Sequence, residues 1–290
     1  MSVTQAGRQP VLPPIRASIE EAKEDLARYG VTRVSGAASM ADIEAARARL
    51  VEQAAGEAEA GVAHTDSGYT AAATEQAANQ RVWNLLNKGD IFASFALNET
   101  ARALAGHIVG PAHLLFSSTA NIARRGGMAQ RLHGDQVFAP AETPFPLIAN
   151  TMWMLDDFTE NNGATRVVPE THELRSWPAE GDEIATVAST GPRGTLMVWD
   201  GRLWHGTGEN VTDTPRHGMI IAYCAPFLRP QENHTVSLRP EVIAGASPEL
   251  LELAGFQHWY GLGMIDGYSE GPRTGRPEKF STIMAPTRPS

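Results

Sequence analysis

The sequence is nearly free of cysteine, because Cys224 is the only one among 290 residues. A single thiol forms no internal disulfide and cannot build a zinc or iron–sulfur site from cysteine ligands. Basic residues are scarce as well: 24 Lys and Arg stand against 33 Asp and Glu, for a net charge of -9. A surface of that sign is unsuited to nucleic-acid phosphates or anionic lipid, so we expect neither as a partner. A bound metal would have to be held by histidine and carboxylate side chains.

Long apolar runs are also missing. The sequence has no stretch of about 18 apolar residues, and residues 1–14 lack the apolar segment of a signal peptide. We therefore expect a cytoplasmic protein without a membrane-spanning helix. The hydrophobic content of 42% is enough for a sizeable core, and we predict a single domain over residues 1–290.

Helical patterns occupy the first third of the chain, residues 15–110. Ser18 and Ser39 each precede apolar residues at helical spacing, which is typical of an N-cap. Gly30 ends the first of these runs, and the second ends near Gly56. Two further helix caps are expected at Asp90 and Asn98.

Short β-like runs follow in residues 111–230, where Gly, Pro and Asn interrupt them. Short strands without long helices between them favour an antiparallel sandwich or jelly roll over a parallel α/β sheet. The predicted fold is therefore mainly β, with the helices of the first third covering one sheet. Residues 231–290 form a C-terminal extension. The expected strands are 113–123, 146–158, 165–169, 194–200 and 217–225.

Three residues are candidate metal ligands. His133 and Asp135 stand two apart, so on an extended segment both side chains reach the same side. His205 lies seventy residues after Asp135, following an expected strand and turn. Two histidines and one carboxylate form a facial triad, which leaves open positions on Fe(II). Arg216 comes eleven residues after His205, and its planar fork suits a carboxylate of a dicarboxylic ligand.

Other residues compete for this role. His64-Thr65-Asp66 repeats the triplet, but it lies in a polar loop with no strand before it, so we set it aside. His172 is the best rival ligand, yet it follows a Pro-Glu turn and is expected to bond to backbone. Five more histidines have no carboxylate at ligand spacing, namely His107, His113, His217, His234 and His258. Three tryptophans near these segments are expected in the core, namely Trp153, Trp199 and Trp204.

Three sequence blocks occur in an order typical of one enzyme family. They are residues 130–136, residues 155–169, and residues 194–200 leading into His205 and Arg216. The chain thereby resembles the phytanoyl-CoA dioxygenase family of Fe(II)/2-oxoglutarate oxygenases over about residues 110–230. Its length, its triad position and the Arg-Val-Trp-Asn-Leu-Leu-Asn run at 81–87 are most similar to the fungal branch that tailors meroterpenoids and alkaloids. The resemblance implies a double-stranded β-helix, a jelly roll with the metal between its sheets, and Fe(II), 2-oxoglutarate and O₂ as cofactors.

The resemblance also implies a role for individual residues. Arg216 corresponds to the anchor of the 2-oxoglutarate C5 carboxylate, with Thr207 beside it. Gln130, Asn150 and Thr165 match positions that contact this cosubstrate in relatives, although Asn150 and Thr165 could equally be hydrogen-bonded strand or turn residues. The run Glu170-Thr171-His172 departs from the Gly-Ser-His of many relatives, which affects the geometry of that loop.

Substrate contacts are implied in the same way. Phe138 resembles an aromatic residue that contacts substrate in the alkaloid enzymes, and its alternative role is to fill the sheet interior. Met128, Asn84 and Asn87 are further pocket candidates.

We therefore expect a dioxygenase that hydroxylates, desaturates or rearranges a small, largely apolar natural product. A hydroxylase of an acyl-CoA or of a small polar metabolite is the alternative, for which Arg124-Arg125 is the one basic pair in view. A jelly-roll binding protein without turnover is the third possibility, and the intact triad argues against it. We also expect a homodimer, with residues 254–268 at the interface or closing a pocket, unless they pack back on the helices. This segment carries Phe256, Trp259, Tyr260, Leu262, Met264 and Ile265.

Overall fold

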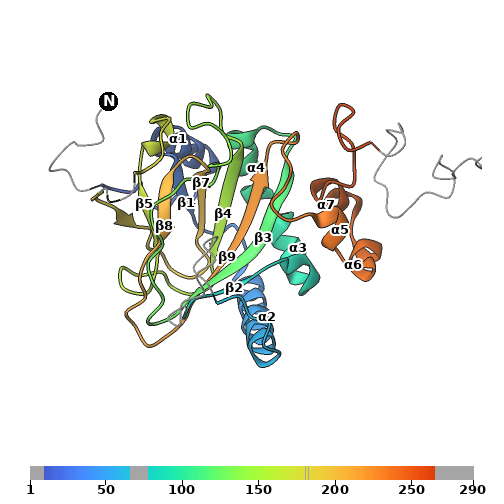
Figure 1. Cartoon of the computed structure of the whole chain (residues 1–290), viewed down its shortest axis with the longest axis horizontal. Coiled ribbons are helices and arrows are strands. Elements are labelled where there is room, and N and C mark those ends of the chain that lie inside the picture. Colours follow the sequence, from blue (N-terminus) through green and yellow to red (C-terminus); the bar gives the residue numbers. More distant parts are fainter. Residues whose placement is uncertain (1–9, 66–77, 180, 182, 265–290) are drawn as a thin grey trace, which may run out of the picture.

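The computed structural model describes residues 10–65, 78–179, 181 and 183–264. Two sheets and a layer of helices make up this part of the chain (Figure 1). One apolar cluster joins the helices to a six-stranded sheet, and a second lies between that sheet and a three-stranded sheet.

The larger sheet is antiparallel throughout, in the order β1-β7-β4-β9-β3-β2. Its side chains alternate between the two faces, as the pleat of a strand requires. On β9, Met219 and Ile221 point into the helix-side core, whereas Ile220 packs in the cluster between the sheets. The six strands are β1 (Val31–Val34), β7 (Leu196–Asp200), β4 (Ile148–Met154), β9 (Arg216–Cys224), β3 (Leu114–Ala123) and β2 (Gln80–Val82).

The smaller sheet contains β6 (Val187–Ala188), β5 (Thr165–Val168) and β8 (Trp204–Thr207), again antiparallel. Val167 of β5 and Trp199 of β7 are both buried in the cluster between the sheets. The two facing antiparallel sheets are those of a jelly roll, and the predicted fold class is confirmed.

Four helices cover the outer face of the larger sheet. Ser18, Ser39 and Asn98 each accept a hydrogen bond from a backbone N three residues ahead, as expected of N-caps. Asp90 makes no such bond, because its own backbone is already helical, so its predicted capping role is wrong. The second helix runs past Gly56 to Glu59. The helices are α1 (Ile19–Tyr29), α2 (Met40–Glu59), α3 (Ile91–Ala96) and α4 (Glu99–Val109), with a 3₁₀ turn η1 (Leu85–Asn87) before α3.

Two strands lie within the part expected to be helical. β1 is buried at all four positions and pairs with β7. β2 pairs with the outer edge of β3. Both are too short to show a period of their own in the sequence. β4 is shorter than expected, because after Met154 the chain turns into a loop that ends at β5.

The C-terminal extension adds three short helices beside α3 (Figure 1), which the sequence analysis did not predict. They are α5 (His234–Ser237), α6 (Pro240–Gly245) and α7 (Pro248–Leu253). Leu250 and Leu253 of α7 are buried in the helix-side core. Within the described residues, no helix is both long enough and apolar enough to span a bilayer.

Candidate metal centre

His133, Asp135 and His205 place three ligand atoms within 4.8 Å of one another. His205 is the second residue of β8, and His133 lies on the extended segment after β3. The two histidines exchange backbone hydrogen bonds, with both N–O distances at 2.9 Å. Asp135 is fixed by its own backbone N, which lies 2.6 Å from the Gly201 carbonyl oxygen. The three residues predicted as ligands therefore lie together, on backbone that is itself hydrogen-bonded.

Both imidazoles are oriented to bind a metal through Nε2. His133 Nδ1 lies 2.9 Å from the Arg131 carbonyl oxygen, and His205 Nδ1 lies 3.0 Å from the Leu203 carbonyl oxygen. A carbonyl oxygen only accepts, so each Nδ1 carries a proton, and in the neutral ring each Nε2 then keeps its lone pair for a metal. The Nε2 atoms of His133 and His205 lie 3.8 and 3.3 Å from the Asp135 carboxylate oxygens. Burial lowers the pKa of His205, which favours the neutral form that metals require.

Asp135 accepts a hydrogen bond from the larger sheet. Asn150 Nδ2, on β4, donates to Asp135 Oδ2 at 2.8 Å. Because His205 belongs to the smaller sheet and Asn150 to the larger one, the ligand cluster lies between the two sheets. The resemblance implied that Asn150 contacts the cosubstrate; the contact that the structure shows is with a ligand residue.

Gly134 separates the two ligands of the His-X-Asp segment. A Cβ at this position would lie 2.3 Å from Trp177 Cζ3. Neighbouring residues of an extended segment face opposite sides, so Trp177 packs against the side away from the ligands. The loop carrying Trp177 is fastened to β8, because Trp204 Nε1 donates to the Ser176 carbonyl oxygen at 2.8 Å. Sequence reasoning missed Trp177, since nothing in its local spacing marks it.

Arg216 begins β9 with its guanidinium buried between the sheets, at 1% exposure. Nη1 donates to the Asn121 carbonyl oxygen at 3.4 Å, Nη2 donates to that of Gly163, and the group lies 4.4 Å over the Phe158 ring. Nε has no partner, and no carboxylate of the described residues forms an ion pair with this side chain. Burial lowers the pKa of Arg216 to about 10, with the charge of Asp156 opposing it, so the group stays cationic at neutral pH.

The other predicted cosubstrate residues form a polar zone beside Arg216. Thr207 Oγ1 donates to Gln130 Oε1 at 2.7 Å and accepts from Asn121 Nδ2 at 2.9 Å. Thr165 on β5 stands opposite Thr207 on β8. Asn121 was missed from the sequence, although it contacts Thr207 through its side chain and Arg216 through its carbonyl oxygen.

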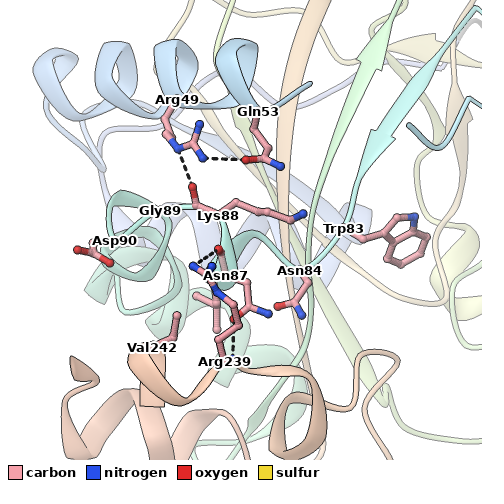
Figure 2. Close-up of a pocket in the computed structure, with 11 residues that line it drawn as sticks. Arg49, Gln53, Trp83, Asn84, Asn87, Lys88, Gly89, Asp90, Arg239 and Val242 are labelled. Carbon is pink, nitrogen blue, oxygen red and sulfur yellow. Dashed lines mark hydrogen bonds between the residues drawn. The ribbon is translucent and has the colours of Figure 1, made fainter. Parts of the chain in front are cut away.

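The four substrate candidates do not all lie together. Phe138 is 53% exposed and lies with its ring 6.3 Å from that of Phe116, so it does not fill the sheet interior. Met128 is likewise exposed. Asn84 and Asn87 instead line a cavity of about 550 Å³ between α2, η1 and α6 (Figure 2). None of the triad or cosubstrate candidates lines that cavity, and the substrate role of all four residues stays a prediction.

The Figure 2 cavity is bounded by internal hydrogen bonds. Asn87 Nδ2 donates to the Ser237 carbonyl oxygen at 2.7 Å, and Asn87 Oδ1 accepts from Arg239 N at 3.0 Å. Arg49 Nε donates to the Lys88 carbonyl oxygen at 2.6 Å. The two Asn87 contacts join the C-terminal helices to η1, and the Arg49 contact joins α2 to the residue after η1.

The competing residues have structural roles. His172 is buried against Gly30, where a Cβ would lie 2.5 Å from its Nδ1, and its Nε2 approaches the Ala27 carbonyl oxygen at 3.4 Å. His64 forms a backbone bridge with Arg81, while Asp66 lies outside the described residues. His217 does have a carboxylate beside it, Asp156, which its sequence spacing did not reveal. The three tryptophans predicted in the core are buried there: Trp153, Trp199 and Trp204.

The geometry agrees with one family of proteins. Residues 26–218 match the phytanoyl-CoA dioxygenase (PhyH) family. The chain belongs to this family. Dioxygenase af480 of Aspergillus fumigatus is 31% identical over 245 residues, covering 83% of this chain and 78% of that protein. Dioxygenase ALT11 of Alternaria alternata is 28% identical over 216 residues, covering 66% of this chain and 68% of that protein.

Solved structures share the fold of this phytanoyl-CoA dioxygenase family member. The epimerase SnoN in complex with Fe³⁺, alpha ketoglutarate and nogalamycin RO has a TM-score of 0.57 at 20% identity, covering 89% of this chain and 96% of that chain. HygX of Streptomyces hygroscopicus with nickel and 2-oxoglutarate bound has a TM-score of 0.58 at 16% identity, covering 73% of this chain and 89% of that chain. The predicted family, its likeness to fungal dioxygenases, the jelly-roll fold and the dioxygenase class are confirmed.

Proposed function

We propose that the protein is an Fe(II)- and 2-oxoglutarate-dependent dioxygenase that oxidises a small, largely apolar natural product in secondary metabolism. The observation that carries this proposal is the ligand cluster, in which two imidazoles and one carboxylate converge, each imidazole with Nδ1 bonded to a carbonyl oxygen. That donor set is the one that suits Fe(II) with open positions for further ligands. Family membership and the fungal dioxygenase relatives support the same conclusion.

His133, Asp135 and His205 would bind the iron, and Arg216 would bind the C5 carboxylate of 2-oxoglutarate. Fe(II) and 2-oxoglutarate together supply the activation of O₂. Arg216 fits its part because a buried guanidinium with a free Nε and no carboxylate partner is suited to an incoming carboxylate. Thr207, Gln130 and Thr165 would complete the polar wall on the smaller-sheet side.

The surroundings of the ligands favour an apolar substrate. Phe138 comes three residues after Asp135 and lies beside Phe116, with its ring open to solvent. The basic pair that an acyl-CoA would need is already engaged: Arg124 Nη2 donates to Gln80 Oε1 at 2.8 Å, and Arg125 pairs with Asp213. The acyl-CoA alternative therefore lacks a free cationic clamp at this pair.

The chelate itself provides the test. Anaerobic protein with Fe(II) should develop a weak visible absorption band when 2-oxoglutarate is added, and should form succinate when O₂ is admitted. Asp135→Ala should lose both signals, because it removes one of three ligands. Asp157→Asn, which alters a carboxylate away from the cluster, should keep them. A wild-type protein without band or succinate would be a binding protein, and the proposal would be wrong.

We further propose a homodimer formed through the hairpin at Trp259–Leu262. Within this segment Ala254 is buried and Phe256 packs on the core, whereas Tyr260 is 90% exposed. Residues 265–268, which include Ile265, lie outside the described residues. An exposed aromatic beside Leu262 and Met264 is the kind of patch that a second copy would cover. Light scattering should give a dimer mass for wild type and a monomer mass for Tyr260→Ser with Leu262→Ser. Equal masses would remove the hairpin from the interface. The cytoplasmic location and the single-domain organisation stay predictions.

A further inference from the structure

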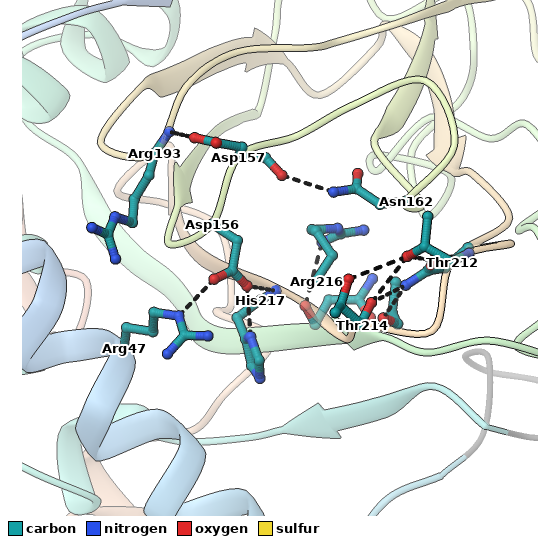
Figure 3. A network of polar contacts seen from close by, with 12 residues as sticks. Arg47, Asp156, Asp157, Asn162, Arg193, Thr212, Thr214, Arg216 and His217 are labelled. Atoms are coloured by element: carbon teal, nitrogen blue, oxygen red, sulfur yellow. Dashed lines mark hydrogen bonds and ion pairs between the residues drawn. The ribbon is translucent and has the colours of Figure 1, made fainter.

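Asp156 is held by three hydrogen bonds where the chain leaves β4 (Figure 3). Its Oδ1 accepts from Arg47 Nε of α2 at 2.6 Å. Its Oδ2 accepts from His217 N at 2.8 Å and from His217 Nδ1 at 2.7 Å. Burial would raise the pKa of this carboxyl, but the hydrogen bonds from His217 and Arg47 outweigh burial and hold the pKa well below its usual range. Asp156 is therefore an anion at neutral pH.

These bonds end one residue away from Arg216. His217 N belongs to the peptide group that follows Arg216, and the His217 carbonyl oxygen accepts from Leu155 N at 3.2 Å. Both polar groups of His217's backbone are thus tied to residues 155 and 156. This pairing fixes the start of β9, and with it the backbone from which the Arg216 side chain extends (Figure 3). The Arg216 guanidinium lies over the Phe158 ring.

Asp156 also supplies a counter-charge without pairing with Arg216. Its charge opposes the effect of burial on the pKa of Arg216, yet no ion pair joins the two side chains. Both carboxylate oxygens of Asp156 are already occupied by Arg47 and His217. A guanidinium paired directly with Asp156 would have to give up that pair before it could bind another carboxylate, whereas here its Nε stays free.

We propose that Asp156 is a positioning residue for Arg216, and that Arg47 keeps Asp156 in this role. The inference rests on the proposed function, in which Arg216 binds the distal carboxylate of 2-oxoglutarate. Loss of Asp156 should lower the affinity for ligands that contact Arg216. It should not change the affinity for ligands that contact only the metal.

Oxalate and 2-oxoglutarate distinguish the two cases. Both chelate iron through adjacent oxygens, but 2-oxoglutarate also carries the distal carboxylate. Anaerobic calorimetric titration of the Fe(II)-loaded protein should show the Kd of 2-oxoglutarate rising about tenfold in Asp156→Asn, the scale of a charge-assisted hydrogen bond. The Kd values of oxalate and of Fe(II) itself should match wild type.

Two further variants complete the test. Asp157→Asn is the matched control, because the Asp157 carboxylate accepts from Arg193 N and contacts neither Arg216 nor His217. It should bind 2-oxoglutarate as wild type does. Arg47→Gln frees Asp156 Oδ1 and should also raise the Kd of 2-oxoglutarate, while Arg47→Lys should raise it less. If Asp156→Asn does not fold, the Kd values of 2-oxoglutarate and oxalate in Arg47→Gln provide the same test.

The inference is overturned if Asp156→Asn binds 2-oxoglutarate like wild type. It is also overturned if the affinities for oxalate and for 2-oxoglutarate fall together, which would indicate a general structural role. A different result marks failure of the proposed function: wild-type protein that binds Fe(II) but shows no affinity for 2-oxoglutarate.

Discussion

Asn150 donates a hydrogen bond to Asp135, with 2.8 Å between Nδ2 and Oδ2. The bond joins a central strand of the larger sheet to a loop residue that would bind the metal. It occupies one lone pair of the carboxylate and so limits the directions in which Asp135 can present the other oxygen. Hydrogen bonds of this kind orient metal ligands and raise metal affinity.

Asn150→Ala should therefore bind Fe(II) more weakly, by roughly 10- to 100-fold, the usual effect of losing such an orienting partner. Competition against a calibrated chelator under anaerobic conditions measures this affinity. Arg216→Ala serves as the comparison, because it removes a cosubstrate contact and no metal contact. It should bind Fe(II) normally and require far more 2-oxoglutarate. Unchanged Fe(II) affinity in Asn150→Ala would mean that Asp135 is oriented by its backbone alone.

Gly134→Ala should distort the ligand segment, because the new Cβ would lie 2.3 Å from Trp177 Cζ3. We expect lower Fe(II) affinity and a lower unfolding temperature. Trp177→Ala should relieve the clash, so the double variant should lose less than the sum of the two single variants. Gly56→Ala is the control, since its Cβ meets nothing within 4 Å in α2 and should stabilise the protein by about 0.5–1 kcal/mol. Additive losses at positions 134 and 177 would argue against the contact.

Gly218→Ala should disturb the anchor for the cosubstrate. A Cβ there would lie 2.9 Å from Arg216 Nη1, 2.7 Å from Met152 Sδ and 3.1 Å from Phe158 Cζ. Because the guanidinium also packs against the Phe158 ring, the new methyl group crowds both side chains and should displace the guanidinium. The KM for 2-oxoglutarate should rise by about tenfold or more, the scale of a lost charge-assisted bond, and Fe(II) affinity should stay the same. A normal KM would show that Met152 alone absorbs the extra methyl group.

Glu232 should make stability depend on pH. Burial raises the pKa of this carboxyl to about 6, against the hydrogen bonds that Ser118 and Asn84 donate to it. The folded protein thus holds the proton more tightly than the unfolded chain. The stability from this group is fully present below the unfolded pKa near 4.5 and is lost as pH rises through about 6.

The free energy of unfolding should fall by about 2 kcal/mol, because the pKa of Glu232 differs by about 1.5 between the folded and unfolded states. Glu232→Gln keeps an acceptor for Asn84 N and should remove this pH dependence. Urea unfolding of both proteins between pH 4.5 and 7 gives the difference directly. His234, two residues on, gives an opposite pH dependence over this range, because burial lowers its pKa from 6.5 to about 4, but it is present in both proteins and cancels in their difference. Parallel curves for the two proteins would contradict the assignment.

The parts that the sequence predicted are those with a local signal. β3, β4, β5, β7 and β9 were found because their apolar runs are four or more residues long and end at turn residues, whereas β8, which carries His205, was not predicted. His133, Asp135 and His205 were found because few residue types bind iron, which makes their spacing informative. The expected metal position between two sheets also agrees with the contacts of Asn150 and His205.

The parts that were missed depend on contacts between distant segments. α5, α6 and α7 have four to six residues each, too few for a helical period to show. Trp177 and Asn121 reach the site only through the fold, and no spacing in the sequence connects them to it. Asp156 stands in a block that resembles the family, but its contact with His217 spans sixty-one residues. Residues of this kind become visible only when the strands are paired.

The reciprocal backbone bonds between His133 and His205 have a consequence for the evolution of the site. Two residues that exchange both N–H and C=O groups are a hydrogen-bonded antiparallel pair, with Cα atoms about 5.5 Å apart whatever their side chains are. The scaffold therefore specifies the separation of these two positions before any metal arrives. Replacement of either imidazole by another donor changes the chemistry offered to the ion without requiring the main chain to be rebuilt. Natural or designed variants can therefore change the metal preference of the site by substituting the side chains at positions 133 and 205, because the backbone spacing of these positions stays the same.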